Sequence, residues 1–185
     1  MIHNPTLVQR LSEGNEKYLT ARESRGDVSP AIRLRTAEKG QEPFAIVIAC
    51  SDSRVIPESI FSCGIGELFV IRVAGNVLDR HQLGSIEYAA GHLGCKLILV
   101  LGHTGCGAVS AALSGGGDGF IRYITDEILL AVGEERDPDA ACELNVKHAV
   151  EVIRREFADH PEIPTGETDI LGAVYDIRTG AVRWL

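Results

Sequence analysis

The 185-residue sequence lacks an excess of positive charge, a long hydrophobic run and a Cys-x-x-Cys pair. It has 18 Lys and Arg against 26 Asp and Glu, so its formal net charge of −8 repels phosphate backbones and anionic membrane surfaces. The longest aliphatic run, LILVL at 97–101, is too short to cross a bilayer, and the N-terminus shows no apolar segment of signal-peptide length. We therefore expect a cytoplasmic protein that binds neither nucleic acid nor membranes.

The five cysteines are odd in number and irregularly spaced. They are Cys50, Cys63, Cys95, Cys106 and Cys142. A chain of this length buries about 70% of the surface of its unfolded form without cross-links. Free thiols or metal ligands are therefore expected before disulfides, and without a Cys-x-x-Cys pair a redox thiol protein is the least favoured function.

Apolar runs alternate with helical patterns along most of the chain. The predicted strands are 44–49, 68–71 and 97–101, and the predicted helices are near 80–93, 120–132 and 140–158. This alternation is typical of βαβ units, so we expect an α/β fold with a mainly parallel central sheet flanked by helices. No internal repeat or linker divides the sequence, which predicts one domain over residues 1–185.

The two ends of the chain differ from this pattern. Residues 5–21 and a segment that starts at Pro30 are predicted helices with few apolar positions. We expect residues 1–40 to form a helical arm with little core of its own, which covers a partner subunit in a dimer. The chain closes with ILGAVYD, a turn at 178–180 and AVRWL, which predict a strand hairpin at the sheet edge.

Two of the predicted strands lead into side chains that bind soft metals. Strand 44–49 runs into Cys50, and strand 97–101 runs into His103 and Cys106. Open α/β sheets place their ligand crevices at the carboxyl ends of the strands. Two cysteines and one histidine suit Zn²⁺ and leave a fourth position open, as in a catalytic site. Buried cysteines can also be plain apolar residues, but the coincidence of two strand ends favours a metal site.

Asp52 and Arg54 can orient a water molecule bound to such an ion. Two thiolates cancel the zinc charge, so a bound water molecule is less acidified and gains from an acceptor that orients it. We expect Asp52 to be that acceptor and Arg54 to hold it by a forked, charge-assisted pair. The alternative is an exposed Asp–Arg pair of little energetic weight, which the buried strand just before it disfavours.

These residues make the chain resemble the β-class carbonic anhydrases. CSDSR at 50–54 resembles the Cys-x-Asp-x-Arg element of that family, and HTGCG at 103–107 resembles its His-x-x-Cys-Gly element. Further similar stretches are LSEGNEKY at 11–18, GELFVIRVAGN at 66–76 and GSIEYA at 84–89. The resemblance covers roughly residues 10–125.

The resemblance implies a carbonate dehydratase that converts CO₂ and water reversibly to bicarbonate and a proton. It implies one Zn²⁺ per chain, bound by Cys50, His103 and Cys106, and a zinc-bound hydroxide that attacks CO₂. Asp52 and Arg54 would be the catalytic orienting pair. It also implies a substrate pocket across a dimer interface, whose residues by matching position are Gln41, Phe69, Ala74, Tyr88 and Gly107.

Several alternatives stay open at this point. A carbonyl sulfide or carbon disulfide hydrolase would use the same site, and a non-catalytic zinc- or bicarbonate-binding module is a possibility of another class. Family members in which the aspartate closes the zinc site carry a tryptophan where this chain has Val47, so we expect an open site. The short acidic segment 133–143 leaves dimer against tetramer undecided, and we expect at least a homodimer.

Overall fold

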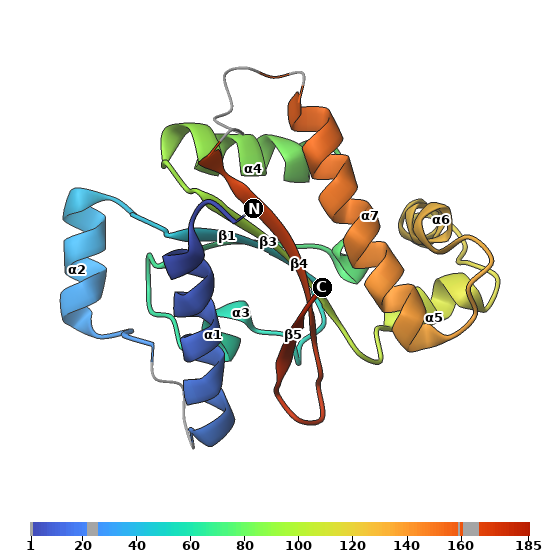
Figure 1. Cartoon of the computed structure of the whole chain (residues 1–185), viewed down its shortest axis with the longest axis horizontal. Helices are drawn as coiled ribbons and strands as arrows, with labels where there is room; N and C mark the ends of the chain where they lie inside the picture. The colour runs from blue at the N-terminus through green and yellow to red at the C-terminus, as the bar shows by residue number, and fades with distance from the viewer. Residues whose placement is uncertain (1, 22–25, 159, 161–166) are drawn as a thin grey trace.

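The computed structural model describes residues 2–21, 26–158, 160 and 167–185. Within them, helices cover both faces of a five-stranded sheet with the order β2-β1-β3-β4-β5 (Figure 1). The strands are β1 (Ala45–Ala49), β2 (Leu68–Arg72), β3 (Leu97–His103), β4 (Asp169–Tyr175) and β5 (Val182–Trp184). The first four run parallel and β5 pairs antiparallel with β4. The predicted α/β fold with a C-terminal hairpin is confirmed.

Two layers of helices cover the sheet, and further helices lie to the left and to the right of it in the view of Figure 1. One face is covered by α4 (Arg80–His92) and α7 (Pro138–Ala158), and the other by α1 (Pro5–Thr20) and α3 (Pro57–Ile60). The remaining helices are α2 (Pro30–Lys39), α5 (Gly107–Leu113), α6 (Ile121–Val132) and the 3-10 turn η1 (Ala74–Asn76). α5 and α6 contact each other and α7. None of the helices in the described ranges combines the length and apolar character that crossing a bilayer requires.

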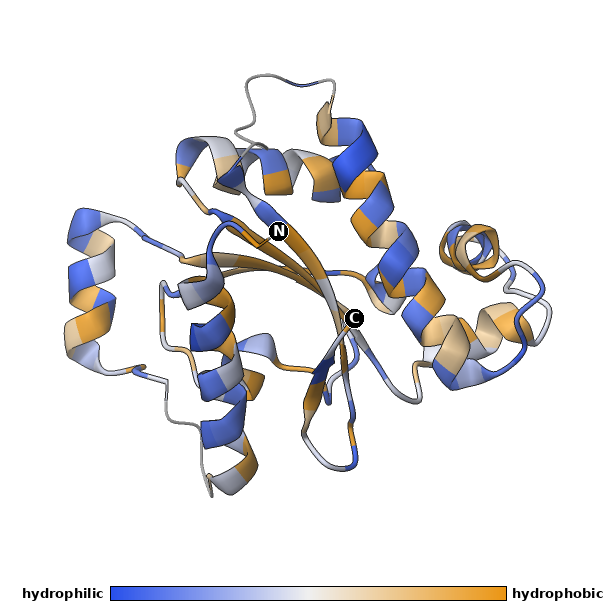
Figure 2. Ribbon diagram, in the orientation of Figure 1, coloured by the Kyte–Doolittle hydropathy of each residue, from blue (hydrophilic) through white to orange (hydrophobic). Residues whose placement is uncertain are grey.

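Strand β1 is apolar at every position because it is covered on all sides. It pairs with β2 and β3 along its two edges. Ile46 and Ile48 pack on the face of α4 and α7, whereas Val47 packs on the face of α1 and α3. A parallel strand with helices on both faces has no solvated side, which explains a continuous apolar run instead of an alternating one. Figure 2 shows these apolar strands in the middle of the molecule.

Helix α1 belongs to the core of its own chain, so our expectation of an arm with little core is wrong for this helix. Leu11 is 0% exposed and packs in the cluster between α1 and the sheet. A Cβ added at Gly14 would lie 2.0 Å from the carbonyl oxygen of Phe61, so the helix packs directly on backbone. The buried side chain of Asn15 bonds to backbone at the end of α3 and in the C-terminal hairpin. The helical period predicted the element but could not show which surface it covers.

Candidate metal centre

The carboxyl ends of β1 and β3 bring the three predicted ligands together. Cys50 directly follows β1, His103 is the last residue of β3, and Cys106 directly precedes α5. The two strands are neighbours, with Ala49 in register with Leu101. One ligand atom from each of the three side chains lies within 4.8 Å of the other two. Residues 53 positions apart in sequence thus converge because parallel strands end at the same edge.

The imidazole of His103 is oriented by the backbone beside it. The residue is 1% exposed, and its Nδ1 lies 3.0 Å from the carbonyl oxygen of Thr104, which makes this nitrogen the donor. Nε2 then carries a free lone pair, and the described part of the chain gives this buried atom no hydrogen-bond partner. Such an atom is costly to bury unless something binds it. A divalent cation with affinity for sulfur and imidazole fits this donor set.

The ionisation states of Cys50 and Cys106 depend on each other. A hydrogen bond from the Cys106 thiol lowers the pKa of Cys50 well below its ordinary value, and the same contact raises the pKa of Cys106. Their sulfur atoms lie within 4.8 Å of each other, so ionisation of one thiol disfavours ionisation of the other, and one stays protonated. A bound cation would replace that proton and hold both sulfurs as thiolates.

Backbone amides also face the sulfur of Cys50. The amide of Asp52 lies 3.4 Å from Cys50 Sγ, and that of Gly75 lies 3.2 Å from it. Both amides donate to the sulfur, so they stabilise its thiolate form. Arg72, at the end of β2, donates to the carbonyl oxygens of Cys50 and Asp52 at 3.1 and 2.7 Å. The loop after β1 is therefore held from the neighbouring strand.

Asp52 and Arg54 form the predicted pair. Arg54 Nε lies 2.9 Å from Asp52 Oδ1, and Arg54 Nη2 lies 2.7 Å from Oδ2. The amide of Arg54 also donates to Oδ1, at 3.0 Å. The guanidinium of Arg54 holds the pKa of Asp52 well below its usual range, so this carboxylate is ionised at neutral pH. Arg54 donates as well to the carbonyl of Gly105 at 3.3 Å, which ties together the loops after β1 and β3.

Two of the five predicted pocket residues lie beside the cysteines. Gly107 starts α5 directly after Cys106. Ala74 starts η1, next to the glycine whose amide donates to Cys50. Both are small residues, and a Cβ added at Gly107 would meet no other atom within 4 Å.

The other three predicted pocket residues lie elsewhere in the chain. The rings of Phe69 on β2 and Tyr88 on α4 are 6.2 Å apart between centroids, and Tyr88 is 47% exposed. Gln41 is exposed and precedes the amino end of β1, whereas Cys50 follows its carboxyl end. A single chain therefore does not gather these side chains around its own cysteines.

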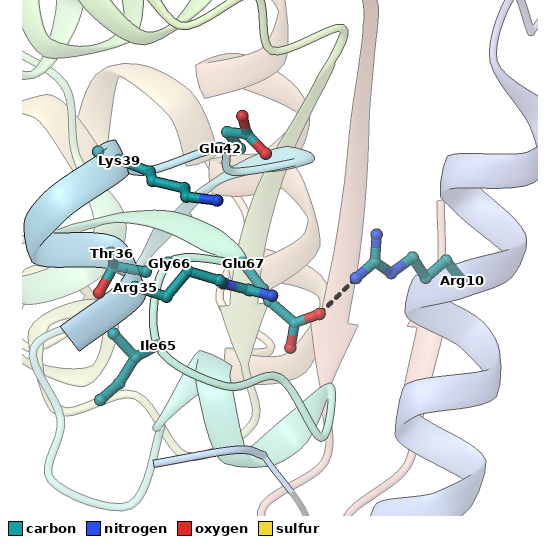
Figure 3. A pocket seen from close by; sticks show the side chains of 9 residues that line it. Arg10, Arg35, Thr36, Lys39, Glu42, Ile65, Gly66 and Glu67 are labelled. Atoms are coloured by element: carbon teal, nitrogen blue, oxygen red, sulfur yellow. Dashed lines mark hydrogen bonds and ion pairs between the residues drawn. The ribbon is translucent and has the colours of Figure 1, made fainter. Parts of the chain in front are cut away.

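A cavity of about 430 Å³ lies at the amino ends of β1 and β2, and neither Cys50, His103 nor Cys106 lines it (Figure 3). It is lined by Arg10, Arg35, Thr36, Lys39, Gly40, Glu42, Ile65, Gly66 and Glu67. Arg10 and Glu67 form an ion pair there. Charged, solvent-exposed walls give little affinity for a small uncharged substrate, so this cavity is not the predicted substrate pocket.

The remaining cysteines are not among the three candidate metal ligands. Cys63, Cys95 and Cys142 are buried and free. Burial raises the pKa of these thiols to about 12, about 11 and about 11, respectively. They are protonated at neutral pH and pack as small buried side chains. Cys63 and Cys95 also donate their thiol hydrogens to the carbonyl oxygens of Phe61 and Pro43, at 3.4 and 3.0 Å.

The fold and the cluster define an α/β protein with a metal-type centre of two cysteines and one histidine at the carboxyl ends of its central strands. The family model described as carbonic anhydrase matches residues 45–182. The chain therefore belongs to the carbonic anhydrase family, an enzyme family of carbonate dehydratases, and its structural relatives are of the β class. The resemblance noted in the sequence is confirmed.

Named relatives support this assignment over nearly the whole chain. Carbonic anhydrase 2 of Mycobacterium tuberculosis is 37% identical over 189 residues, which cover 96% of this chain and 91% of the relative. The carbonic anhydrase of Pseudomonas aeruginosa is 35% identical, with 77% of this chain and 73% of the relative covered.

Solved structures show the same fold. The β-carbonic anhydrase CafA of Aspergillus fumigatus has a TM-score of 0.72 at 28% identity, covering 84% of this chain and 81% of that protein. A structure of the tetrameric β-carbonic anhydrases from Sordaria macrospora has a TM-score of 0.66 at 27% identity, covering 99% and 95%.

Proposed function

We propose that this protein catalyses the reversible hydration of CO₂ to bicarbonate and a proton, with one Zn²⁺ held by Cys50, His103 and Cys106. The observation that carries the proposal is the buried cluster of these three side chains in a member of the carbonic anhydrase family. Bound zinc supplies Lewis-acid chemistry that makes water nucleophilic near neutral pH. Three protein ligands leave one position of a tetrahedral shell free for this chemistry.

Asp52 orients the reacting water. An ionised carboxylate can only accept hydrogen bonds, so a water molecule next to it must donate a hydrogen to it. That contact turns the lone pair of the water toward the substrate. Arg54 occupies the other lone pairs of the carboxylate and fixes its plane, as the forked contacts at 2.7 and 2.9 Å indicate.

The substrate pocket requires a second copy of the chain. Phe69, Ala74 and Tyr88 offer apolar surface for uncharged CO₂, and Gln41 offers an amide that can donate to an oxygen as charge develops there. Because Gln41 lies at the far end of β1 from Cys50, the partner subunit is proposed to supply it. In this proposal the chain is one domain whose first 40 residues contact the partner, in a dimer or a larger assembly. The free cysteines fit the reducing cytoplasm.

Metal content and turnover test the proposal together. The purified protein is expected to contain one zinc per chain and to hydrate CO₂ in a stopped-flow indicator assay. Cys106→Ser should lose both the zinc and the activity. Cys63→Ser is the matched control, because it removes a buried thiol outside the cluster and should keep both. A metal-free preparation with undiminished turnover would contradict the proposal.

The same preparation distinguishes the proposed function from the two alternatives. Sulfide release from carbonyl sulfide or carbon disulfide with a higher kcat/KM than CO₂ hydration would make the protein a hydrolase of these sulfur compounds. Stoichiometric zinc without CO₂ hydration between about pH 6 and pH 9, where a catalytic metal site ionises its water, would make it a binding module.

A further inference from the structure

Asn145 is a polar residue on an apolar face of α7. It is 4% exposed. Ala141 and Cys142, on the preceding turn, belong to the same buried cluster as Cys50 and Cys106. An amide buried among apolar groups costs free energy unless it finds a hydrogen-bond partner. The identity of that partner therefore indicates what Asn145 does.

The partner of Asn145 lies one step from the metal centre. Asn145 Nδ2 donates to the carbonyl oxygen of Gly75 at 2.8 Å, across 70 positions of sequence. The amide of the same glycine donates to Cys50 Sγ at 3.2 Å. One glycine therefore connects helix α7 to the sulfur of a proposed zinc ligand.

Gly75 needs an external contact to keep its orientation. It interrupts η1 with φ 69° and ψ 12°, in the left-handed region that glycine enters without strain but does not prefer strongly. A Cβ at this position would lie 2.9 Å from Ile128 Cδ1 and 3.0 Å from Ala108 Cβ. The site therefore favours glycine, the residue type with the most freedom of backbone torsion. The hydrogen bond from Asn145 holds the peptide group after Gly75, and the bond from the Gly75 amide to Cys50 Sγ holds the peptide group before it, so together they restrict both backbone torsions of the residue.

We propose that Asn145 is a positioning residue of the metal centre, which holds the amide of Gly75 against the sulfur of Cys50. The inference rests on the proposed function, because it takes Cys50 to be a zinc ligand. An N–H···S hydrogen bond draws negative charge away from a thiolate and restricts its direction, so it sets both the donor strength and the geometry of the ligand. A merely structural Asn145 would affect stability and leave the metal unaffected.

Asn145→Leu tests this role, because leucine keeps a similar volume and removes the donor. We expect zinc affinity to fall about tenfold, and the sulfur-to-metal charge-transfer absorption of the cobalt-substituted protein to shift. Ile153→Val is the control, since Ile153 lies on the same helix, is 0% exposed and packs in the cluster on the α4 side. The control should be less stable than wild type with zinc affinity and cobalt absorption unchanged. Equal metal properties in both variants would overturn the inference.

The unaltered protein offers a second test in case Asn145→Leu does not fold. With an NMR-active cadmium isotope in place of zinc, we expect scalar coupling between cadmium and the amide proton of Gly75, transmitted through Cys50 Sγ. The amide of Asp52, at 3.4 Å from the same sulfur, is the internal reference. Bound cadmium without coupling to Gly75 would overturn this inference alone. Failure to bind zinc or cadmium would refute the proposed function, and the inference with it.

Discussion

The side chains around the candidate metal centre fall into two kinds: those that offer a ligand atom to the ion, and those that lie outside the group of ligand atoms. Cys50 and His103 present a sulfur and a bare ring nitrogen to a common point. Asp52 is held by Arg54 through both carboxylate oxygens and lies outside that group of ligand atoms. Substitutions of the two kinds of residue should therefore separate metal binding from turnover.

Asp52→Asn should keep zinc and lose activity. The amide has nearly the shape of the carboxylate, but it replaces one acceptor oxygen by a donor group and no longer forms a charged pair with Arg54. We expect kcat/KM to fall about 10- to 100-fold, measured by stopped-flow hydration on protein of known zinc content. Loss of zinc in this variant would show that Asp52 is itself a ligand.

Arg54→Ala should raise the pKa of Asp52 toward 3.8, because the guanidinium is the main cause of its depression. Since the folded pKa is the lower one, ionised Asp52 stabilises the fold above pH 3.8, and this contribution declines as the pH falls from there toward the lowered pKa. Carbon NMR of the Asp52 carboxyl during an acid titration measures the midpoint in both proteins. An unchanged midpoint would mean that backbone amides, not Arg54, set the pKa.

The sequence pattern predicted the cysteines and the histidine that the structure brings together, and it missed side chains that bond to backbone carbonyl groups near them. Cys50 and His103 were found because a reactive side chain after an apolar run is visible in one dimension. Asn145 and Arg72 contact carbonyl groups 70 and 22 positions away, which no local pattern encodes. The available signal was a polar residue on the apolar side of a predicted helix, and only the fold gives it a partner.

Among the elements, β3 and α1 show what limits sequence prediction. The apolar run ended the predicted strand at residue 101, but β3 continues to His103 because β4 remains alongside as far as Tyr175. A strand end depends on its neighbour, which local composition does not reveal. Likewise the period of α1 was visible, but its contacts with the sheet were not.

Leu11→Ala tests the correction for α1. Deletion of a fully buried leucine side chain should lower the free energy of unfolding by about 2–5 kcal/mol, measured by urea denaturation. Leu130→Ala is the matched control, because Leu130 on α6 is 72% exposed and surface substitutions stay within about 0.5 kcal/mol. Equal small effects would mean that α1 contributes little to the core of its own chain.

At the scale of the whole molecule, the proposed pocket is divided between two ends of the sheet. Gln41 precedes β1 and Cys50 follows it, so β1 separates them within one chain. In the described structure, β2 is an edge strand, and Phe69 and Tyr88 lie together beside that edge. A second copy that approaches from this side could supply what one chain cannot.

Mixed dimers test this division. Cys50→Ser and Gln41→Ala should each lower activity strongly when pure. Dimers refolded from an equal mixture should regain about one quarter of wild-type activity, because half of them are mixed and each mixed dimer has one intact site of two. Activity of the mixture equal to the mean of the two pure variants would place Gln41 in the same site as the Cys50 of its own chain.

The covering of β1 on both faces has a further consequence for how the enzyme matures. The core around β1 is complete through apolar packing and strand pairing. His103 ends β3, Cys50 follows β1 and Cys106 precedes α5, so these contacts already hold the elements that carry the three side chains. Small zinc fingers, by contrast, fold only as the ion binds. Here the apoprotein can acquire its shape first and load the ion afterwards, so chelation should yield a folded chain that regains turnover on reconstitution.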